Sequence, residues 1–543
     1  MSQVTAERRQ LLKAMLGAGV ATMTPAPLFA QAAASKVLRV AMTVADIPLT
    51  TGQASQGGEG TRFIGLTLYD GLINWDLSRS DVVSTLRPGL ATEWSVDSET
   101  KMLWTFKLRP NVKFHDGSAF DADAVIWNLD KLIKSDAPQY DAAQAAQGSQ
   151  YFTSIESYRK IDAGTVQIKT KVPDAVFPYQ IAGIMYSSPS RWEEVGRDWG
   201  RFAQRPSGTG PFILERLVQR DRAELVKNAN YWDPARIPKS DRLILLCMPD
   251  ANTRVAALLS GQVDFVEAPA PDSVPRLRKS GMQIITNLYP HVWPYQLSVL
   301  EDSPFKDVRV RRAANLAIDR DGLVKLLGGL AIPAKGHVTT GHPWFGTPSF
   351  QIKYDPEDAK RLLREAGFDP GRPCKIKVMI STSGSGQMQP LPMNEFIQEN
   401  LTAVGFEVEF EVLEWEALRG RRRAGAFAAE NRGRHGLNNS WSFLEPDIGI
   451  LGVTMDRLRP PAGYNWGGVN DPKLNQLGER AKVTFDPAEQ NKILAEIHSY
   501  MVDQALWIWV VHDLNPRALG PKVKGFVQAQ SWFQDLTPVY VEN

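Results

Sequence analysis

Residues 375–412 read KIKVMISTSGSGQMQPLPMNEFIQENLTAVGFEVEFEV, and this stretch decides the fold class. Apolar residues alternate with polar ones over 376–380 and again over 406–412, which predicts two strands. A helix is predicted between them over 392–404, and Gly405 is expected to end it. A strand–helix–strand unit of this length favours parallel pairing with a right-handed crossover, so the class is mixed α/β.

Further strands are predicted on both sides of this unit. Residues 104–108 alternate between apolar and polar side chains, as a half-buried strand does. The runs 243–248 and 506–511 are apolar without interruption, which predicts strands covered on both faces. A shorter strand is expected over 263–266.

Several helices have clear start and stop signals. Asp355 and Asp486 are each followed by proline, so each Asp can cap a helix whose first position is the proline. Gly367 is expected to end the first of these helices. A short helix is predicted over 250–259, ended by Gly261.

Length and composition limit the possible functions. The chain has 543 residues, 43% of them hydrophobic and 22% charged, so at least two lobes of a globular protein are expected. Once the N-terminal 34 residues are removed, acidic and basic residues are equal in number, which argues against nucleic acid as a partner. The two cysteines match neither a zinc motif nor a disulfide framework, and the seven histidines are scattered, so no metal or other cofactor is expected.

The N-terminus has the pattern of an export signal. Arg8, Arg9 and Lys13 precede an apolar stretch over 14–24, and small residues follow around Ala30. The arginine pair resembles a twin-arginine signal, with an ordinary basic signal as the alternative. No cysteine follows the apolar stretch, so no lipid anchor is expected there. We therefore expect residues 1–34 to be removed and the mature protein to be soluble in the periplasm.

Four groups of motifs, in this order and spacing, resemble the family-5 extracellular solute-binding proteins, the receptors of peptide and nickel ABC importers. They are RPGLATEW (87–94) with WTFKLR (104–109), KFHDG (113–117) and ADAV (122–125); GTGPF (208–212) with NANYW (228–232); PFKDVRVRRA (304–313) with AIDR (317–320); and YDP (354–356) with LL (362–363) and AGF (366–368).

This resemblance implies a two-lobed periplasmic-binding-protein fold of class II type. The first lobe would combine residues 35–75, 186–288 and 511–543. A small domain of residues 76–185 would be inserted in this lobe. The second lobe would span residues 289–510.

The resemblance also implies where a ligand would bind. In the family, the cleft is lined by the chain-crossing segment, here 291–296, and by a tryptophan-containing loop, here 438–447. The implied ligand-binding residues are Trp293, Tyr295, Asn439, Trp441, Ser442 and Phe443. Further candidates are Tyr151 and Phe152 from the insertion, Trp344 and Trp466 at the rim, and Arg434 as a group that could hold an anion.

One departure from the family bears on the ligand. Peptide-binding members typically carry an Asp before the acidic-Pro pair to hold the ligand's α-amino group, and the matching position here is near Ser442. No Asp lies between Asn438 and Leu444. This favours an opine, a sugar conjugate or a modified peptide over a ligand held by a free amine.

Arginines cluster at residues 419–423, and three interpretations stay open. The cluster could capture an anionic solute, dock to the permease, or form the solvated C-terminal turn of a helix, where cations complement the helix dipole.

The resemblance implies that the protein captures a small solute reversibly, without changing any bond of the solute. A solute touching both lobes would favour their closure, and the closed form would be presented to an inner-membrane ABC permease. We expect a monomeric binding protein rather than an enzyme. The alternatives are a secreted hydrolase for a peptide or glycoside, in which Glu445 and Asp447 would be the acidic pair, and a binding module for solute sensing or chaperoning.

Overall fold

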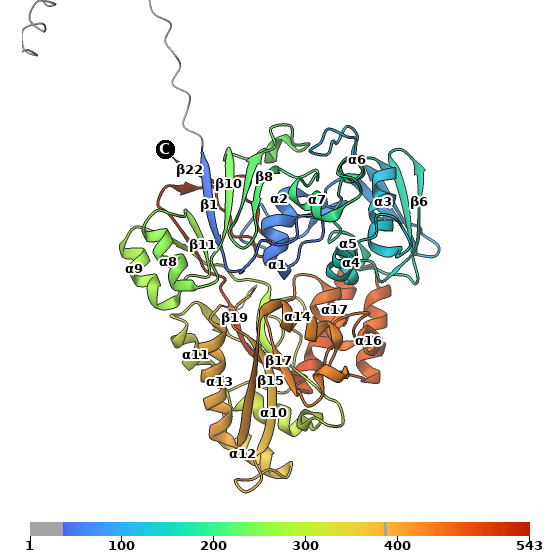
Figure 1. The fold of residues 1–543 in the computed structure, drawn as a ribbon. Helices are drawn as coiled ribbons and strands as arrows, with labels where there is room; N and C mark the ends of the chain where they lie inside the picture. The colour runs from blue at the N-terminus through green and yellow to red at the C-terminus, as the bar shows by residue number, and fades with distance from the viewer. Residues whose placement is uncertain (1–35, 385–387, 543) are drawn as a thin grey trace, which may run out of the picture. The chain divides into compact units, whose positions relative to one another are not determined.

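The computed structural model describes residues 36–384 and 388–542, so the predicted signal sequence lies outside the described residues. A first seven-stranded sheet has the order β12-β20-β11-β1-β10-β9-β8. Its strands are β1 (Val37–Met42), β8 (Phe212–Val218), β9 (Arg222–Lys227), β10 (Arg242–Cys247), β11 (Phe265–Glu267), β12 (Gln283–Ile285) and β20 (Arg517–Leu519). We call the part of the chain around it the β1 side; in Figure 1 it occupies the upper half of the described chain.

A four-stranded antiparallel sheet lies beside the first sheet on the β1 side (Figure 1). It consists of β4 (Ala91–Val96), β5 (Leu103–Leu108), β6 (Ile155–Asp162) and β7 (Thr165–Thr170), in the order β4-β5-β7-β6. Helix α3 (Ala122–Ile133) begins at Asp121, whose carboxylate accepts the backbone N–H of Ala124 at 3.0 Å. The helix packs its apolar face into the same core as Phe106 of β5. Short pairs β2 (Ile73–Trp75) with β3 (Leu86–Pro88), and β21 (Val523–Lys524) with β22 (Tyr540–Val541), complete the strands of this side.

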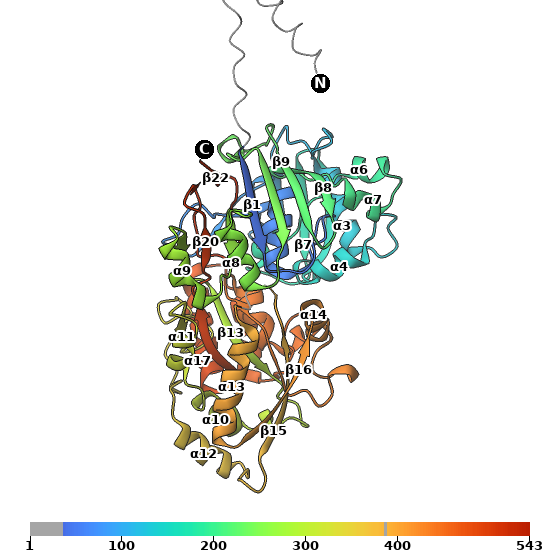
Figure 2. The same ribbon diagram turned by 60° about the vertical axis from the view of Figure 1, so that its left-hand side comes forward.

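A second large sheet forms the β13 side, in the lower half of Figures 1 and 2. Its order is β14-β19-β13-β17-β15-β16, and β18 also pairs with β13. The strands are β13 (His291–Leu297), β14 (Ala331–Pro333), β15 (Cys374–Ser381), β16 (Phe406–Leu413), β17 (Gly436–Asn438), β18 (Trp441–Ser442) and β19 (Trp507–Asp513).

The strand–helix–strand unit predicted from residues 375–412 is confirmed. β15 and β16 are parallel, with Cys374 opposite Phe406 and Ser381 opposite Leu413. Helix α13 (Pro390–Val404) connects them and starts two residues earlier than predicted, because Pro390 and Pro392 both fit its first turn. It ends at Gly405, whose φ of 117° belongs to the left-handed region.

The predicted helix caps are also confirmed. Asp355 accepts the N–H of Asp358 at 3.0 Å at the start of α12 (Pro356–Glu365). Asp486 accepts the N–H of Glu489 at 2.9 Å at the start of α17 (Pro487–Asp503). On the β13 side they are accompanied by α10 (Val308–Leu316), α11 (Arg320–Leu326), α14 (Trp415–Ala424), α15 (Gly452–Thr454) and α16 (Pro472–Val483).

The remaining described α-helices lie on the β1 side, and they include the helix predicted over 250–259. They are α1 (Gly57–Gly60), α2 (Leu66–Leu68), α4 (Ala142–Gly148), α5 (Phe177–Ile181), α6 (Pro189–Glu194), α7 (Trp199–Gln204), α8 (Ala251–Leu259) and α9 (Val274–Lys279). In Figure 2, α8 and α9 lie next to β20, and they share a core with residues of β1, β11 and β20, so they cover one face of the first sheet.

The two uninterrupted apolar runs have different surroundings. Every residue of β19 is buried, as predicted for the run at 506–511. The prediction for 243–248 is wrong on one face, because Leu243 and Leu245 are buried in β10 whereas Ile244 and Leu246 are only half-buried. Apolar residues on both faces therefore do not require that both faces be fully covered by neighbouring elements.

Two short segments, 286–290 and 514–516, connect the two large sheets. The strands that follow and precede them, β13 and β19, are antiparallel neighbours. At this point the His291 ring Nδ1 lies 2.9 Å from a carboxylate oxygen of Asp513, and both side chains are buried. The connection between the sheets is therefore narrow and made by adjacent strands, as a hinge requires.

Candidate functional site

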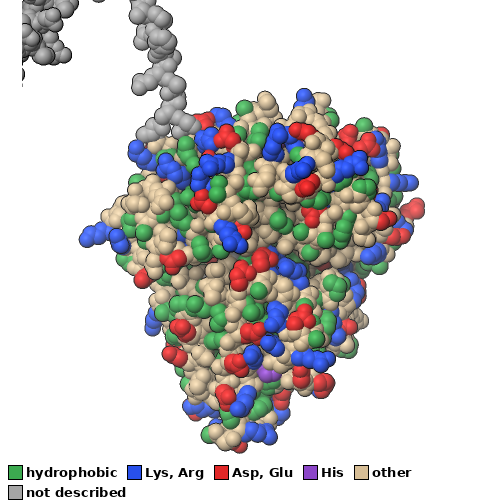
Figure 3. Space-filling model, viewed as in Figure 1, with side chains coloured by type: hydrophobic (Ala, Val, Ile, Leu, Met, Phe, Trp, Pro, Cys, Tyr) green, Lys and Arg blue, Asp and Glu red, His purple; other side chains and the backbone are tan. Residues whose placement is uncertain are grey.

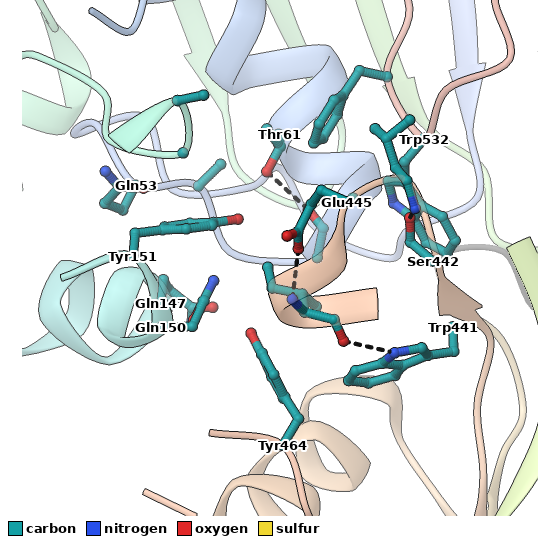
Figure 4. Close-up of a pocket in the computed structure, with 18 of the residues that line it drawn as sticks. Gln53, Thr61, Gln147, Gln150, Tyr151, Trp441, Ser442, Glu445, Tyr464 and Trp532 are labelled. Atoms are coloured by element: carbon teal, nitrogen blue, oxygen red, sulfur yellow. Dashed lines mark hydrogen bonds between the residues drawn. The ribbon is translucent and has the colours of Figure 1, made fainter. Parts of the chain in front are cut away.

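A large cavity lies where the β1 side meets the β13 side (Figure 4). Its empty space is about 1230 Å³, counted with its mouth. The β1 side contributes residues of the loop and helix at 53–61, of 147–151 and of the C-terminal pair 532–533. The β13 side contributes α14 and the loop at 439–448. The cavity is therefore walled by segments that are far apart in sequence and belong to both sheets.

Eight of the described residues that line the cavity are aromatic. They are Trp75, Tyr151, Tyr179, Trp415, Trp441, Tyr464, Trp532 and Phe533. Rings of this kind offer a large contact area and a polar edge, and they lose little rotamer entropy on binding. The surface suits an organic solute with flat or apolar parts.

Trp532 is held over the start of α1. A Cβ atom added at Gly58 would lie 1.0 Å from the indole Nε1 of Trp532, so no larger residue fits there without displacing the ring. Glycine at this position lets the C-terminal tryptophan pack directly on the backbone that lines the cavity.

The tryptophan-containing loop is fixed by strand pairing. In β18, Trp441 pairs with Val292 and Ser442 pairs with His291. The Trp441 indole N–H donates to the carbonyl oxygen of Ile448 at 3.1 Å, as Figure 4 shows. Asn439 accepts a hydrogen bond from the side-chain amide of Gln296 at 2.9 Å. These bonds hold the loop's polar edge in place at the cavity.

Glu445 is a buried carboxyl group in the cavity wall. Its oxygens accept the backbone N–H groups of Asp447 at 2.6 Å and of Ile448 at 2.7 Å, and so cap the helical turn that follows. Burial, reinforced by the nearby charge of Asp447, raises the pKa of Glu445 to about 8. Burial therefore favours the neutral form of this carboxyl group.

Two arginines of α14 line the same cavity. Arg419 forms an ion pair with Glu416 at 2.7 Å. The guanidinium of Arg422 lies 5.0 Å from the ring centres of both Trp441 and Tyr464. Burial lowers the pKa of Arg422 to about 10, so it stays charged at neutral pH.

A buried polar cluster joins the two sides next to the cavity. The ammonium group of Lys482 in α16 lies 3.2 Å from a carboxylate oxygen of Asp447 and 3.4 Å from one of Asp174. The side-chain amide of Gln180 in α5 donates to Asp447 at 2.7 Å. The backbone N–H of Ala175 donates to the carbonyl oxygen of Lys482 at 2.6 Å. Asp174, Ala175 and Gln180 belong to the β1 side, so this clasp spans the two sides.

The structure brings four of the residues predicted from sequence to the cavity wall: Tyr151, Asn439, Trp441 and Ser442. Figure 4 shows the Tyr151 ring approaching from the β1 side and Trp441 from the β13 side.

The other predicted residues do not line this cavity. Trp293 and Tyr295 are buried in the core of the β13 side, where the Tyr295 hydroxyl donates to Asn394. Phe443 is in a second core of that side, with its ring centre 5.6 Å from that of His512. No residue of β13 lines the cavity, whereas Phe443 is in the loop that does, between Ser442 and Leu444, and its own side chain is buried in the core.

The peripheral candidates are likewise engaged elsewhere. Arg434 pairs with Glu411 at 2.7 Å. The indole N–H of Trp344 donates to Asn491 at 2.8 Å. Phe152 packs against the core of the four-stranded sheet, and Trp466 packs with Trp415 behind the cavity wall.

Several cavity residues were not predicted from sequence as ligand contacts. They are Gly58, Trp75, Tyr179, Trp415, Tyr464, Glu445, Trp532 and Phe533. A usable signal existed for Trp532 and Phe533, because this adjacent aromatic pair stands in the polar segment QAQSWFQD at 528–535. The remaining residues are brought together only by the packing of the two sides.

Comparison with known proteins gives one family. The model of the bacterial extracellular solute-binding proteins, family 5, matches residues 85–472. The glutathione-binding protein GsiB of Pectobacterium atrosepticum is 28% identical over 97% of both chains. The di/tripeptide-binding protein 2 of Pseudomonas aeruginosa is 26% identical over 84% of this chain and 87% of its own length.

Solved structures share the fold. The dipeptide-binding protein of a Pseudoalteromonas species, solved with Met-Leu, superposes with a TM-score of 0.81 at 21% identity, over 93% of this chain and all of that chain. The α/β two-lobed fold predicted from the resemblance is thus confirmed. The chain therefore belongs to the bacterial extracellular solute-binding proteins of family 5, the solute receptors of ABC importers.

Proposed function

We propose that this chain is the periplasmic receptor of an ABC importer and captures a small polar solute by closing two lobes around it. The observation that carries the proposal is the aromatic cavity walled from both sides, with Trp532 and Tyr151 facing Trp441 and Tyr464. A solute there contacts both sides, so it binds the closed arrangement better than an open one and shifts the population toward closure. An inner-membrane permease would then accept the solute from the closed form, with no bond of the solute changed.

The lobes of the proposal are those expected from the resemblance. The first comprises 35–75, 186–288 and 511–543, with 76–185 inserted, and the second comprises 289–510. The division is supported by the first large sheet, whose strands all come from the first lobe, and by the four-stranded sheet, which lies within the insertion. The hinge would be the adjacent connections at 286–290 and 514–516.

The proposed solute is peptide-like, an opine or a sugar conjugate, in contact with Tyr151, Asn439, Trp441 and Ser442. The names of the two curated relatives support a peptide-like solute. The aromatic wall and the amide and hydroxyl groups beside it would suit any of the three classes.

Location and charge fit the same proposal. The N-terminal signal would export the chain, by the twin-arginine route, to the periplasm. No described helix combines the length and apolar character needed to cross a membrane. Acidic and basic side chains are interspersed over the face seen in Figure 3, which suits a receptor whose partner is a small molecule rather than a nucleic acid.

The proposal is tested on protein purified from the periplasm of a bacterial host. Native mass spectrometry would detect a retained solute and give its mass. After removal of that solute, X-ray scattering with and without it should show a smaller radius of gyration in its presence. A solute that raises the melting temperature without changing the scattering would refute closure. Steady formation of a cleaved product would instead favour a hydrolase.

A further inference from the structure

The arginine cluster of α14 points in two directions. Arg419, Arg422 and Arg423 are three and four residues apart, so they share one face of the helix, whereas Arg421 lies off this face. Arg421 pairs with Glu411 at 2.9 Å, and Arg434 pairs with the same carboxylate. Arg421 is therefore paired away from the cavity, whereas Arg419 and Arg422 line it and Arg423 lies next to them on the helix.

Two of the three arginines, Arg419 and Arg423, share one carboxylate. Glu416 lies 2.7 Å from Arg419 and 3.8 Å from Arg423, and it also accepts the backbone N–H of Gln56 from the β1 side at 3.0 Å. The Arg422 side chain makes neither a hydrogen bond nor an ion pair with any residue that the structure describes, and its Nε is sealed from solvent without an acceptor. Three positive charges thus surround one negative charge on this helix, and two of the three, Arg419 and Arg422, line the cavity.

No other charge of the cavity wall compensates this excess. Both oxygens of Glu445 already accept backbone N–H groups, and burial favours its neutral form. Asp447, the next acidic residue along the chain, is paired with Lys482. The faces of Trp441 and Tyr464, where an ammonium group of a ligand could stack, are already covered by Arg422.

We infer that the solute carries a net negative charge and that Arg422 binds its anionic group, a carboxylate or a phosphate. This inference rests on the proposed function. A planar guanidinium accommodates either group with two parallel hydrogen bonds, and in a site closed off from water such a charge-assisted pair is strong. The aromatic rings on its two sides hold the guanidinium in position before the solute arrives, so little ordering is needed on binding.

The test uses the mature protein freed of retained solute and solutes matched in shape but not in charge. The peptide set is Ala-Gln, Ala-Glu, N-acetyl-Ala-Gln and Ala-Gln amide. The sugar set is a hexose, its sugar acid and its phosphate, and an opine and any solute recovered from the periplasm are added. Thermal shift identifies binders and calorimetry measures their affinity. The expected binders are net anions, and the comparison of sugar acid with sugar phosphate distinguishes the two anionic groups.

Arg422→Gln is expected to weaken binding of the anion by about 30-fold or more, because it removes one partner of a buried charge pair. Arg421→Gln, one residue away and paired with Glu411 outside the cavity, should leave the affinity unchanged. Arg422→Lys, which keeps the positive charge, should bind better than Arg422→Gln. Without solute, Arg422→Gln should melt at the wild-type temperature or above it, because it removes a buried charge that has no partner.

The outcomes separate the two proposals. If neutral or cationic solutes bind best, or if Arg422→Gln binds as tightly as Arg421→Gln, the inference is overturned while the receptor function stands. A lower melting temperature of solute-free Arg422→Gln, or equal losses in Arg422→Lys and Arg422→Gln, would show that the arginine serves packing and would also overturn it. If no solute of any charge binds the wild type, the proposed function itself fails.

Discussion

Replacing Lys482 with methionine removes the ammonium group that lies between two buried carboxylates of the clasp. The side chain of Lys482 is 5% exposed, and those of Asp174 and Asp447 are 0% and 11% exposed. Methionine keeps most of the length of the lysine side chain. The substitution therefore leaves two carboxylates from opposite sides of the cavity facing each other without a cation.

The free-energy cost of Lys482→Met depends on the burial of the two carboxylates and on the position of the clasp between the two sides. Breaking a buried charge pair by removing one partner costs about 3–5 kcal/mol when the remaining charge stays buried. Here the remaining carboxylates regain water if the two sides separate, so the cost falls on closure rather than on unfolding. A loss of about 3 kcal/mol in closure weakens solute binding by about 150-fold.

Calorimetry on the wild type and Lys482→Met measures this loss, and X-ray scattering measures closure. The matched control is Lys473→Met on the same helix, because Lys473 pairs with Glu496 at 3.6 Å with about half of each side chain exposed. An exposed pair contributes little, so the control should bind within about 2-fold of the wild type.

A pH series gives a second check on the reasoning. Burial, with the charge of Asp447 close by, raises the pKa of Asp174. Without Lys482 the pKa of Asp174 should rise further, so acidification should protonate Asp174 and the binding defect of Lys482→Met should shrink at low pH. If Lys482→Met binds within about 3-fold of the wild type at neutral pH, the clasp does not support closure and the reasoning is refuted.

Three further predictions follow from single residues. The pKa of Glu445 is about 8 in the folded state against 4.5 in the unfolded state, so the stability that its protonation provides is lost as the pH rises. Between about pH 5.5 and 7 the wild type should therefore lose about 2 kcal/mol more unfolding free energy than Glu445→Gln, measured by urea unfolding. Parallel stability curves for the two proteins would contradict this. Gly58→Ala should displace Trp532 and weaken solute binding by about 10-fold or more in calorimetry, whereas Gly420→Ala, which meets open space, should bind normally. Lys131 is fully buried, and burial lowers its pKa to about 7. Because Lys131→Met removes a buried charge, it should raise the free energy of unfolding by about 1 kcal/mol or more at neutral pH. A lower melting temperature of Lys131→Met would contradict this.

Local sequence was sufficient to predict elements whose stability is local. The caps at Asp355 and Asp486 and the stop at Gly405 depend on residues within one turn, and each is found in the structure. The strand at 243–248 was predicted correctly, but its surroundings were not. Coverage of a strand face depends on distant elements, which a run of apolar residues does not specify.

The cavity shows the same limit. Trp441 and Ser442 could be predicted because the loop that carries them resembles a known family, but Trp293 and Tyr295 on the neighbouring strand point into the core. No residue of that strand lines the cavity, and whether a strand reaches the cavity depends on the packing of distant elements, which the local pattern does not specify. Trp532 comes from the other end of the chain, so only packing of the two sides places it in the wall.

The strength of the clasp limits how the solute can control closure. A solute must bind the closed form about 10⁴-fold better than the open form to move the population from almost fully open to almost fully closed. A clasp that stabilised the closed form by much more than a few kcal/mol would close the receptor without solute. Binding of the solute would then no longer change the population of the closed form. The helix that carries Arg422 also receives the Gln56 N–H on its Glu416. A solute bound to Arg422 therefore acts on a helix that already contacts the β1 side through Glu416 and Gln56. The helix that recognises the charge of the solute is thus also the one that contacts the opposite side of the cavity.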